Sequence, residues 1–104
     1  MVSECDSVIR QSIPAVRIAV ARLLRAKYKI GQGEIAKRMG ITQAAVNKYL
    51  NGKYSGKIKK IVTGMKAAGF DKKIAGMIVS GKGVSLVNKN VDRAASSMYI
   101  RANR

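Results

Sequence analysis

The chain has 104 residues, of which 21 are Lys or Arg and five are Asp or Glu, so its formal net charge at pH 7 is +16. This length predicts one domain with a single modest core. Aromatic residues make up only 5 %, and no long alternation of β-branched residues occurs, which favours an all-α fold. The charge predicts a polyanionic partner, because soluble domains ordinarily mix both signs.

The composition also argues against several classes of protein. The chain has no His, the commonest metal ligand and general base, and its single cysteine excludes an internal disulfide or a cysteine-rich zinc site. We therefore expect no enzyme activity, no metal and no cofactor. Cys5 lies between Glu4 and Asp6, which disfavour its thiolate. A structural or incidental role and a disulfide across a dimer axis both remain open for it.

No membrane association is expected. The most apolar stretch, residues 15–24, is interrupted by two arginines, and no helix combines a continuous apolar face with a basic one. The acidic residues near the N-terminus do not fit a signal peptide. A nucleic acid is therefore a better candidate partner than a membrane, and we expect a cytoplasmic, nucleoid-associated protein.

The first predicted helix covers residues 14–28. Ser12-Ile13-Pro14 is a start signal, because proline is tolerated in the first turn of a helix. Apolar residues then recur at helical spacing, which predicts a stripe that covers the back of the next unit. These residues are Val16, Ala19, Val20, Leu23 and Leu24. Residues 1–11 are weakly patterned, and we expect a brief helical turn there at most.

Residues 32–51 predict two short helices, 32–39 and 43–50, joined by a tight turn. Ala36 would lie where the helices cross, Gly40 can take a positive φ in the turn, and Val46 would point back onto the first helix. Thr42 is a suitable N-cap for the second helix. This is the pattern of a helix-turn-helix, in which the second helix enters the major groove of DNA.

Three further helices are expected, over 58–68, 71–79 and 85–101. Asp71 would cap the second of these, and residues 80–83 would end it. Val87, Val91, Ala94 and Met98 form a heptad-like stripe in the last helix. The stripe is either a dimer seam or an ordinary core-facing surface. Residues 74–75 and 87–91 also resemble 35–36 and 46–50, so that 71–91 is either a degenerate second helix-turn-helix or a chance similarity.

The expected packing leaves one face of helix 43–50 free to contact DNA. Gln43 can pair with an adenine edge, Ala44 can lie against a thymine methyl group, and Asn47 can read a second base or a phosphate. Gln32 is expected to bond a phosphate and to brace Gln43. The candidate DNA-binding residues are Gln32, Thr42, Gln43, Ala44, Asn47, Lys48, Asn51, Lys53, Tyr54 and Lys57.

Residues 32–52 resemble the helix-turn-helix of the phage repressor and Cro (XRE-type) superfamily. The similarity includes a glutamine that opens each helix and the Leu-Asn-Gly ending at 50–52. It implies that Gln32 braces Gln43, which reads adenine. Residues 13–17, 42–46 and 49–53 also look like the small archaeal helix-turn-helix transcriptional regulators. Those have a proline-opened leading helix and a helical tail, often with cysteines where Ser-Ser-Met-Tyr stands here at 96–99.

The expected function is that of a sequence-specific regulator that binds double-stranded DNA as a homodimer. Within the single domain 1–104, residues 12–55 would hold the leading helix and the helix-turn-helix, and 56–104 the C-terminal helices. Three alternatives remain open. They are a nucleoid-associated architectural protein, a tandem helix-turn-helix protein that binds a repeated element such as a CRISPR repeat, and an adaptor that binds RNA or protein.

Overall fold

The fold was taken from a computed structural model, which describes the backbone of residues 2–102 and the side chains of residues 12–97. The predicted all-α class is confirmed, and over the described range the chain has six helices and no strand. The helices are α1 (Val2–Ala26), α2 (Gln32–Met39), α3 (Gln43–Leu50), α4 (Gly56–Ala68), α5 (Phe70–Val79) and α6 (Val84–Ala102).

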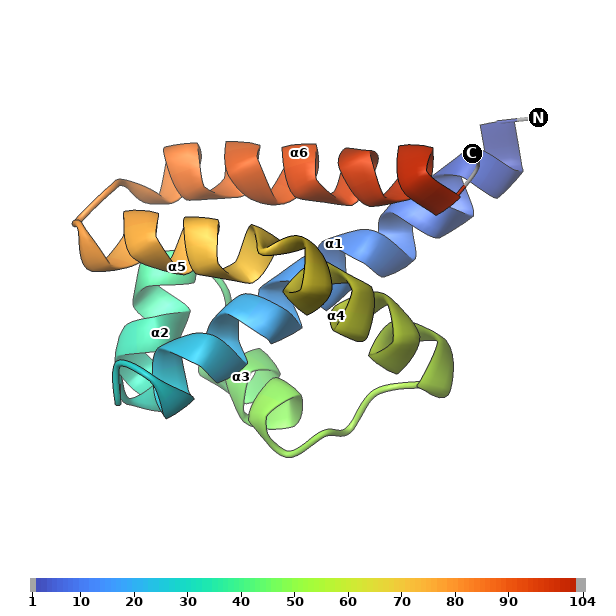
Figure 1. The fold of residues 1–104 in the computed structure, drawn as a ribbon. Coiled ribbons are helices and arrows are strands. Elements are labelled where there is room, and N and C mark those ends of the chain that lie inside the picture. Colours follow the sequence, from blue (N-terminus) through green and yellow to red (C-terminus); the bar gives the residue numbers. More distant parts are fainter. Residues whose placement is uncertain (1, 103–104) are drawn as a thin grey trace.

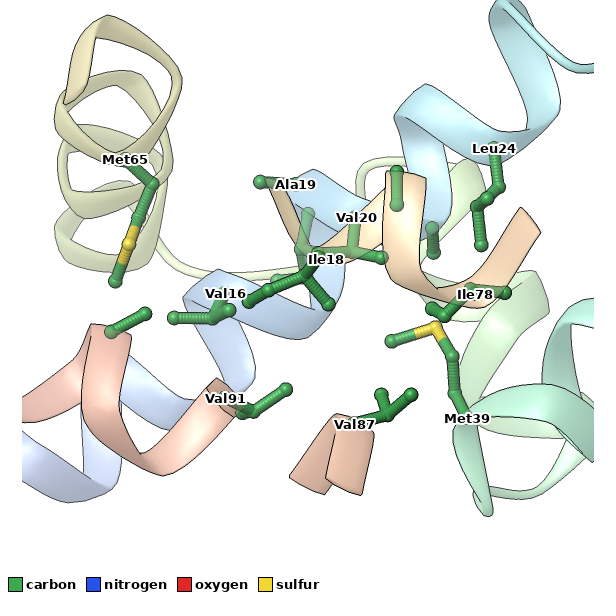
Figure 2. Close-up of a cluster of buried hydrophobic side chains, with 14 of the residues drawn as sticks. Val16, Ile18, Ala19, Val20, Leu24, Met39, Met65, Ile78, Val87 and Val91 are labelled. Carbon is green, nitrogen blue, oxygen red and sulfur yellow. The ribbon is translucent and has the colours of Figure 1, made fainter. Parts of the chain in front are cut away.

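Helix α1 forms the centre of the fold, and each of the other five helices packs against it (Figure 1). In Figure 2, Val16, Ile18 and Val20 of α1 lie among side chains from α2, α4, α5 and α6. A helix with neighbours on several sides must be apolar around most of its circumference. The stripe predicted from the sequence was therefore too narrow. The residues of α1 with no exposed surface are Ala15, Val16, Ile18, Ala19, Val20, Ala21 and Leu24.

The predicted start of the first helix was wrong. Helix α1 begins at Val2 and contains Pro14 in its interior. An interior proline removes one backbone hydrogen bond and crowds the preceding turn. Helix α1 packs against α6, α4 and α5, and the apolar surface buried there offsets this cost. The side chain of Cys5 lies outside the described ones, so its alternatives stay predictions.

The predicted cap of the fifth helix was also wrong. Gly69, with φ +81°, is both the C-cap of α4 and the N-cap of α5, so the helix starts at Phe70. Asp71 instead lies buried in the first turn, where its Oδ1 atom accepts a hydrogen bond of 2.9 Å from the Lys72 backbone N–H. A carboxylate near a helix N-terminus is still favourable electrostatically.

The stripe on α6 is part of the core. Val87, Val91 and Ala94 are all less than 5 % exposed within the single chain. The interpretation of this stripe as a dimer seam is therefore wrong for these three residues, and the side chain of Met98 lies outside the described ones. Helices α5 and α6 run antiparallel along each other in Figure 1. The idea that 71–91 is a second helix-turn-helix stays a prediction.

Candidate nucleic-acid interface

The turn between α2 and α3 has the predicted geometry. Gly40 adopts φ +68° and ψ +35°, and its N–H donates to the carbonyl of Lys37 at 3.3 Å. The Ile41 N–H donates to the carbonyl of Ala36 at 3.0 Å. Such bonds satisfy carbonyls that the end of a helix leaves free. Ala36 and Val46 are buried, as predicted. The two helices therefore form a tight unit.

Helix α3 begins where the sequence predicted. The hydroxyl of Thr42 accepts a hydrogen bond of 3.1 Å from the backbone N–H of Ala45, which is the expected N-cap. Because Val46 points inward, the opposite face of the helix is turned to solvent. All six residues predicted for this face are exposed, namely Thr42, Gln43, Ala44, Asn47, Lys48 and Asn51. We call these six residues the α3 outer face.

A short polar chain crosses this face. The Nδ2 atom of Asn51 donates to the Asn47 Oδ1 atom at 3.0 Å and to the Asn47 backbone carbonyl at 2.9 Å. The Nδ2 atom of Asn47 in turn makes a long hydrogen bond of 3.5 Å to the Oε1 atom of Gln32. Asn47 is therefore contacted from two sides, closely by Asn51 and at a longer distance by Gln32.

This arrangement differs from the expected one, in which Gln32 braces Gln43. Gln32 opens α2, whereas Gln43 follows the turn at the far end of that helix. Eight helical residues span about 12 Å, so the start of α2 lies beside the middle of α3. Asn47 is one turn further along α3 and lies within reach. In the structure Gln32 thus contacts Asn47, and the brace of Gln43 by Gln32 stays a prediction.

Sequence reasoning gave Arg22 no role at the interface. Its Nη1 atom donates to the backbone carbonyl of Tyr49 at 3.4 Å and to the hydroxyl of Tyr54 at 3.3 Å. The Tyr49 carbonyl lies in the last turn of α3, where carbonyls lack helical partners and positive charge is favourable. Arg22 thus ties α1 to the end of α3. The sequence did offer one sign of this role, because Arg22 is a charged residue within the mostly apolar stretch 15–24.

The loop after α3 holds the other predicted contact residues. Lys53 and Lys57 are exposed, whereas Tyr54 is half-buried. The Tyr54 hydroxyl is occupied by Arg22, and the Nζ atom of Lys59 lies 6.0 Å from the centre of its ring. Tyr54 therefore anchors the loop to the body of the protein. The two lysines remain free to meet a phosphate backbone.

A hollow of about 400 Å³ lies beside the interface, between α1, α2, α3 and α4. Its lining is mostly basic and polar, and no carboxylate is part of it. The lining residues are Arg22, Arg25, Ala26, Gln32, Leu50 and Lys66. The hollow therefore places Arg22, Arg25 and Lys66 together, and their charges make this side of the protein positive.

Helix α2 is fixed to the C-terminal helices by Arg38. Its Nε atom pairs with the Oε2 atom of Glu34 at 2.6 Å, and its Nη1 atom donates to the backbone carbonyl of Ile78 at 3.3 Å. The hydrogen bond from Arg38 lowers the pKa of Glu34 below its ordinary value, and the nearby charges of Arg38 and Lys37 add to this effect. The lowered pKa favours the charged form of Glu34, which is paired with the Arg38 guanidinium.

Residues 22–62 match the model of a helix-turn-helix family. The match covers less than half of the chain, from the end of α1 to the middle of α4, and includes the whole α3 outer face. It supports a place in the Cro/repressor-like helix-turn-helix superfamily, whose members bind DNA. No curated protein and no solved structure matches the chain.

Among the described residues, every helix is too short or too polar to cross a membrane. In the same part of the chain, no group of three or more His, Cys, Asp or Glu side chains comes together as metal ligands would.

Proposed function

We propose that the protein is a transcriptional regulator that recognises a specific sequence in double-stranded DNA through α3. The observation that carries the proposal is the contrast between the two sides of this helix. Val46 is fully buried, whereas Gln43, Ala44 and Asn47 are exposed on the opposite side. The N-terminal part of such a helix lies deepest in the major groove. Gln43 would then pair with an adenine, and Ala44 would contact a thymine methyl group.

Asn47 is the second base-reading residue in this proposal. Its hydrogen bonds to Gln32 and Asn51 hold the amide in one orientation, so less side-chain freedom is lost when DNA binds. Asn47 is one helical turn from Gln43 and on the same face. The two residues can therefore read neighbouring base pairs, and Lys48 follows at the rim of the groove.

Phosphate contacts would come from the loop after α3. Lys53 and Lys57 are exposed there, and Arg22 anchors the loop through Tyr54. Contacts to phosphates place a protein on the duplex but carry no sequence information. A homodimer on two half-sites about one helical turn apart is part of the proposal. It would require a surface other than the buried stripe of Val87, Val91 and Ala94.

The distribution of charge favours a second candidate, an architectural protein of the nucleoid. Several exposed cations lie on α5, on α6 and in the turn between these two helices, outside the helix-turn-helix. Such charges bind DNA of any sequence. They include Lys72, Lys73, Lys82, Lys89 and Arg93. In this candidate the same fold binds DNA with little preference for sequence.

The two candidates differ in their specificity ratio. We would first select bound sequences from random DNA and then measure the affinities for the selected site and for random duplexes over a range of salt concentrations. A regulator should prefer its site by at least about 10³-fold. Each phosphate that the protein neutralises adds about 0.9 to the slope of log K against log salt. A ratio near one would overturn the regulator and leave the architectural protein.

A further inference from the structure

A second basic surface lies on α5 and α6. It consists of Lys72 and Lys73 in the first turn of α5 and of Lys89 and Arg93 one turn apart on α6, all of them exposed. We call these four residues the α5–α6 basic face. Asp92 is the only exposed carboxylate among residues 70–97, because Asp71 is buried. This part of the surface is therefore strongly positive.

The α5–α6 basic face and the α3 outer face lie on different sides of the molecule. Helix α3 packs on α1 and α2, whereas α6 packs mainly on α1 and α5. Figure 1 shows α6 along the upper edge of the fold and α3 at the lower edge, with α1 and α5 between them. A duplex bound at α3 would therefore not reach the α5–α6 basic face.

Two of these cations share a hollow of about 220 Å³ between the helices. Lys73 and Arg93 line it together with Asn90 and Ser97, over a floor that includes Ile74 and Ala94. Phe70 also lines this hollow, and no carboxylate does. The Nδ2 atom of Asn90 already donates to the carbonyl of Leu86. The two charged side chains and the Ser97 hydroxyl provide hydrogen-bond donors of the kind that phosphate oxygens accept.

Salt screens the cations of the α5–α6 basic face from a duplex that is bound at α3. The Cα atoms extend over 39 × 26 × 22 Å, and the Debye length at physiological ionic strength is about 8 Å. Cations on the α5–α6 basic face thus contribute little to the binding of a duplex at α3. They also repel one another, which opposes the compact state. A polyanion that binds directly to this face would remove that repulsion.

We propose that the α5–α6 basic face binds a second DNA duplex, so that one chain bridges two duplexes. This proposal rests on the proposed binding of the first duplex at α3. The second partner is a duplex because a chain bound at α3 meets neighbouring DNA at high local concentration. The contacts are to phosphates, and the second duplex can therefore have any sequence.

The test is a capture assay with the full chain. One duplex is attached to a bead, the protein is added, and the retention of a second, labelled duplex is measured. Binding to a single duplex is measured in parallel in solution. The variant K73A/R93A removes two charges from the hollow. The control variant K37A/K82A removes two charges from exposed lysines beside a different hollow, between α2 and the α5–α6 turn.

We expect the wild type and K37A/K82A to capture the second duplex. K73A/R93A should capture at least about tenfold less, because two phosphate contacts are lost, while its binding to a single duplex at α3 is kept. The proposal is overturned if the wild type binds single duplexes and captures no second one. It is also overturned if K73A/R93A still captures, as a dimer bridging through two α3 helices would.

Three other outcomes also count against the α5–α6 basic face. If K73A/R93A and K37A/K82A lose capture of the second duplex equally, capture depends on the net charge of the protein and not on this face. A loss of single-duplex binding by K73A/R93A would place these residues in the first site. If structured RNA displaces the labelled second duplex from the bead-bound complex, the partner of this face is RNA. The proposed function is tested separately, by binding to single duplexes. It fails if Q43A prefers the same DNA sequences as the wild type and to the same degree.

Discussion

Gly40 in the turn of the helix-turn-helix lies against Val84, the first residue of α6, and a Cβ atom at Gly40 would come within 2.6 Å of the Val84 Cγ1 atom. The C-terminal helices therefore support the DNA-binding unit at its turn. Arg38 makes a second connection close by, through the carbonyl of Ile78. The position of α3 relative to the core thus depends on α5 and α6 as well as on α1.

The substitution Gly40→Ala should destabilise the protein by about 2–5 kcal/mol. A left-handed backbone costs an L-residue about 1–2 kcal/mol, and overpacking adds about 1–3 kcal/mol. Unfolding in urea at equilibrium would measure the free energy. Gly33→Ala is the control, because nothing lies within 4 Å of a Cβ atom there. The control should be neutral or stabilising by about 0.5–1 kcal/mol. Equal stability of the two variants would contradict the close contact with Val84.

Gln43 and Lys57 should respond differently when each is replaced by alanine. Loss of Gln43 should cost about 1–3 kcal/mol on the selected DNA site and relax the preference for one base pair. Loss of Lys57 should weaken binding to all duplexes alike and reduce the salt slope by about one. Titrations of both variants on selected and random duplexes would measure this. If Gln43→Ala kept its full preference, the α3 outer face would not be the reading surface.

Gln32 should be coupled to Asn47 and not to Gln43. Residues in contact show interaction energies of about 0.5–3 kcal/mol in double-mutant cycles, and the structure pairs Gln32 only with Asn47 among these side chains. The cycle Gln32→Ala with Asn47→Ala, measured by affinity for the selected site, should therefore give a non-zero term. The matched cycle with Gln43→Ala should give a term close to zero. The reverse result would restore the brace implied by the phage repressor resemblance.

The features that the sequence predicted correctly are local. Gly40 and Thr42 act within a few residues of the chain, and their roles follow from the spacing of residues 32–51. The features that were missed depend on contacts between distant segments. Helix α1 continues through Pro14 and packs against α6, and Arg22 reaches Tyr54 because the loop folds back. Periodicity along the chain carries no information about such partners.

The Glu34–Arg38 pair should make a small contribution to stability that depends on pH. The pKa of Glu34 is lower in the folded protein than in the unfolded chain, so the contribution is present above the unfolded pKa. It is lost as the pH falls through the folded pKa. Because the pair is exposed, the effect should be small and should shrink at high salt. Urea unfolding of the wild type and Glu34→Gln at neutral and acidic pH would measure it. A difference between them that persisted unchanged at pH 3 would contradict the ion pair.

Replacement of Arg22 should loosen the loop after α3 as well as destabilise the fold. Arg22→Met keeps most of the half-buried side-chain volume but removes the donor to the Tyr49 carbonyl and the Tyr54 hydroxyl. Hydrogen bonds from charged groups contribute about 1.5–3 kcal/mol to stability. Because both bonds are long, we expect Arg22→Met to lower the free energy of unfolding by an amount near the lower end of this range. Tyr54→Phe removes only one of the two bonds and should cost less. Hydrogen exchange should then show faster exchange of the backbone N–H groups of residues 51–54 in Arg22→Met. If exchange there were unchanged, Arg22 would support the core alone and would not position the loop that carries Lys53.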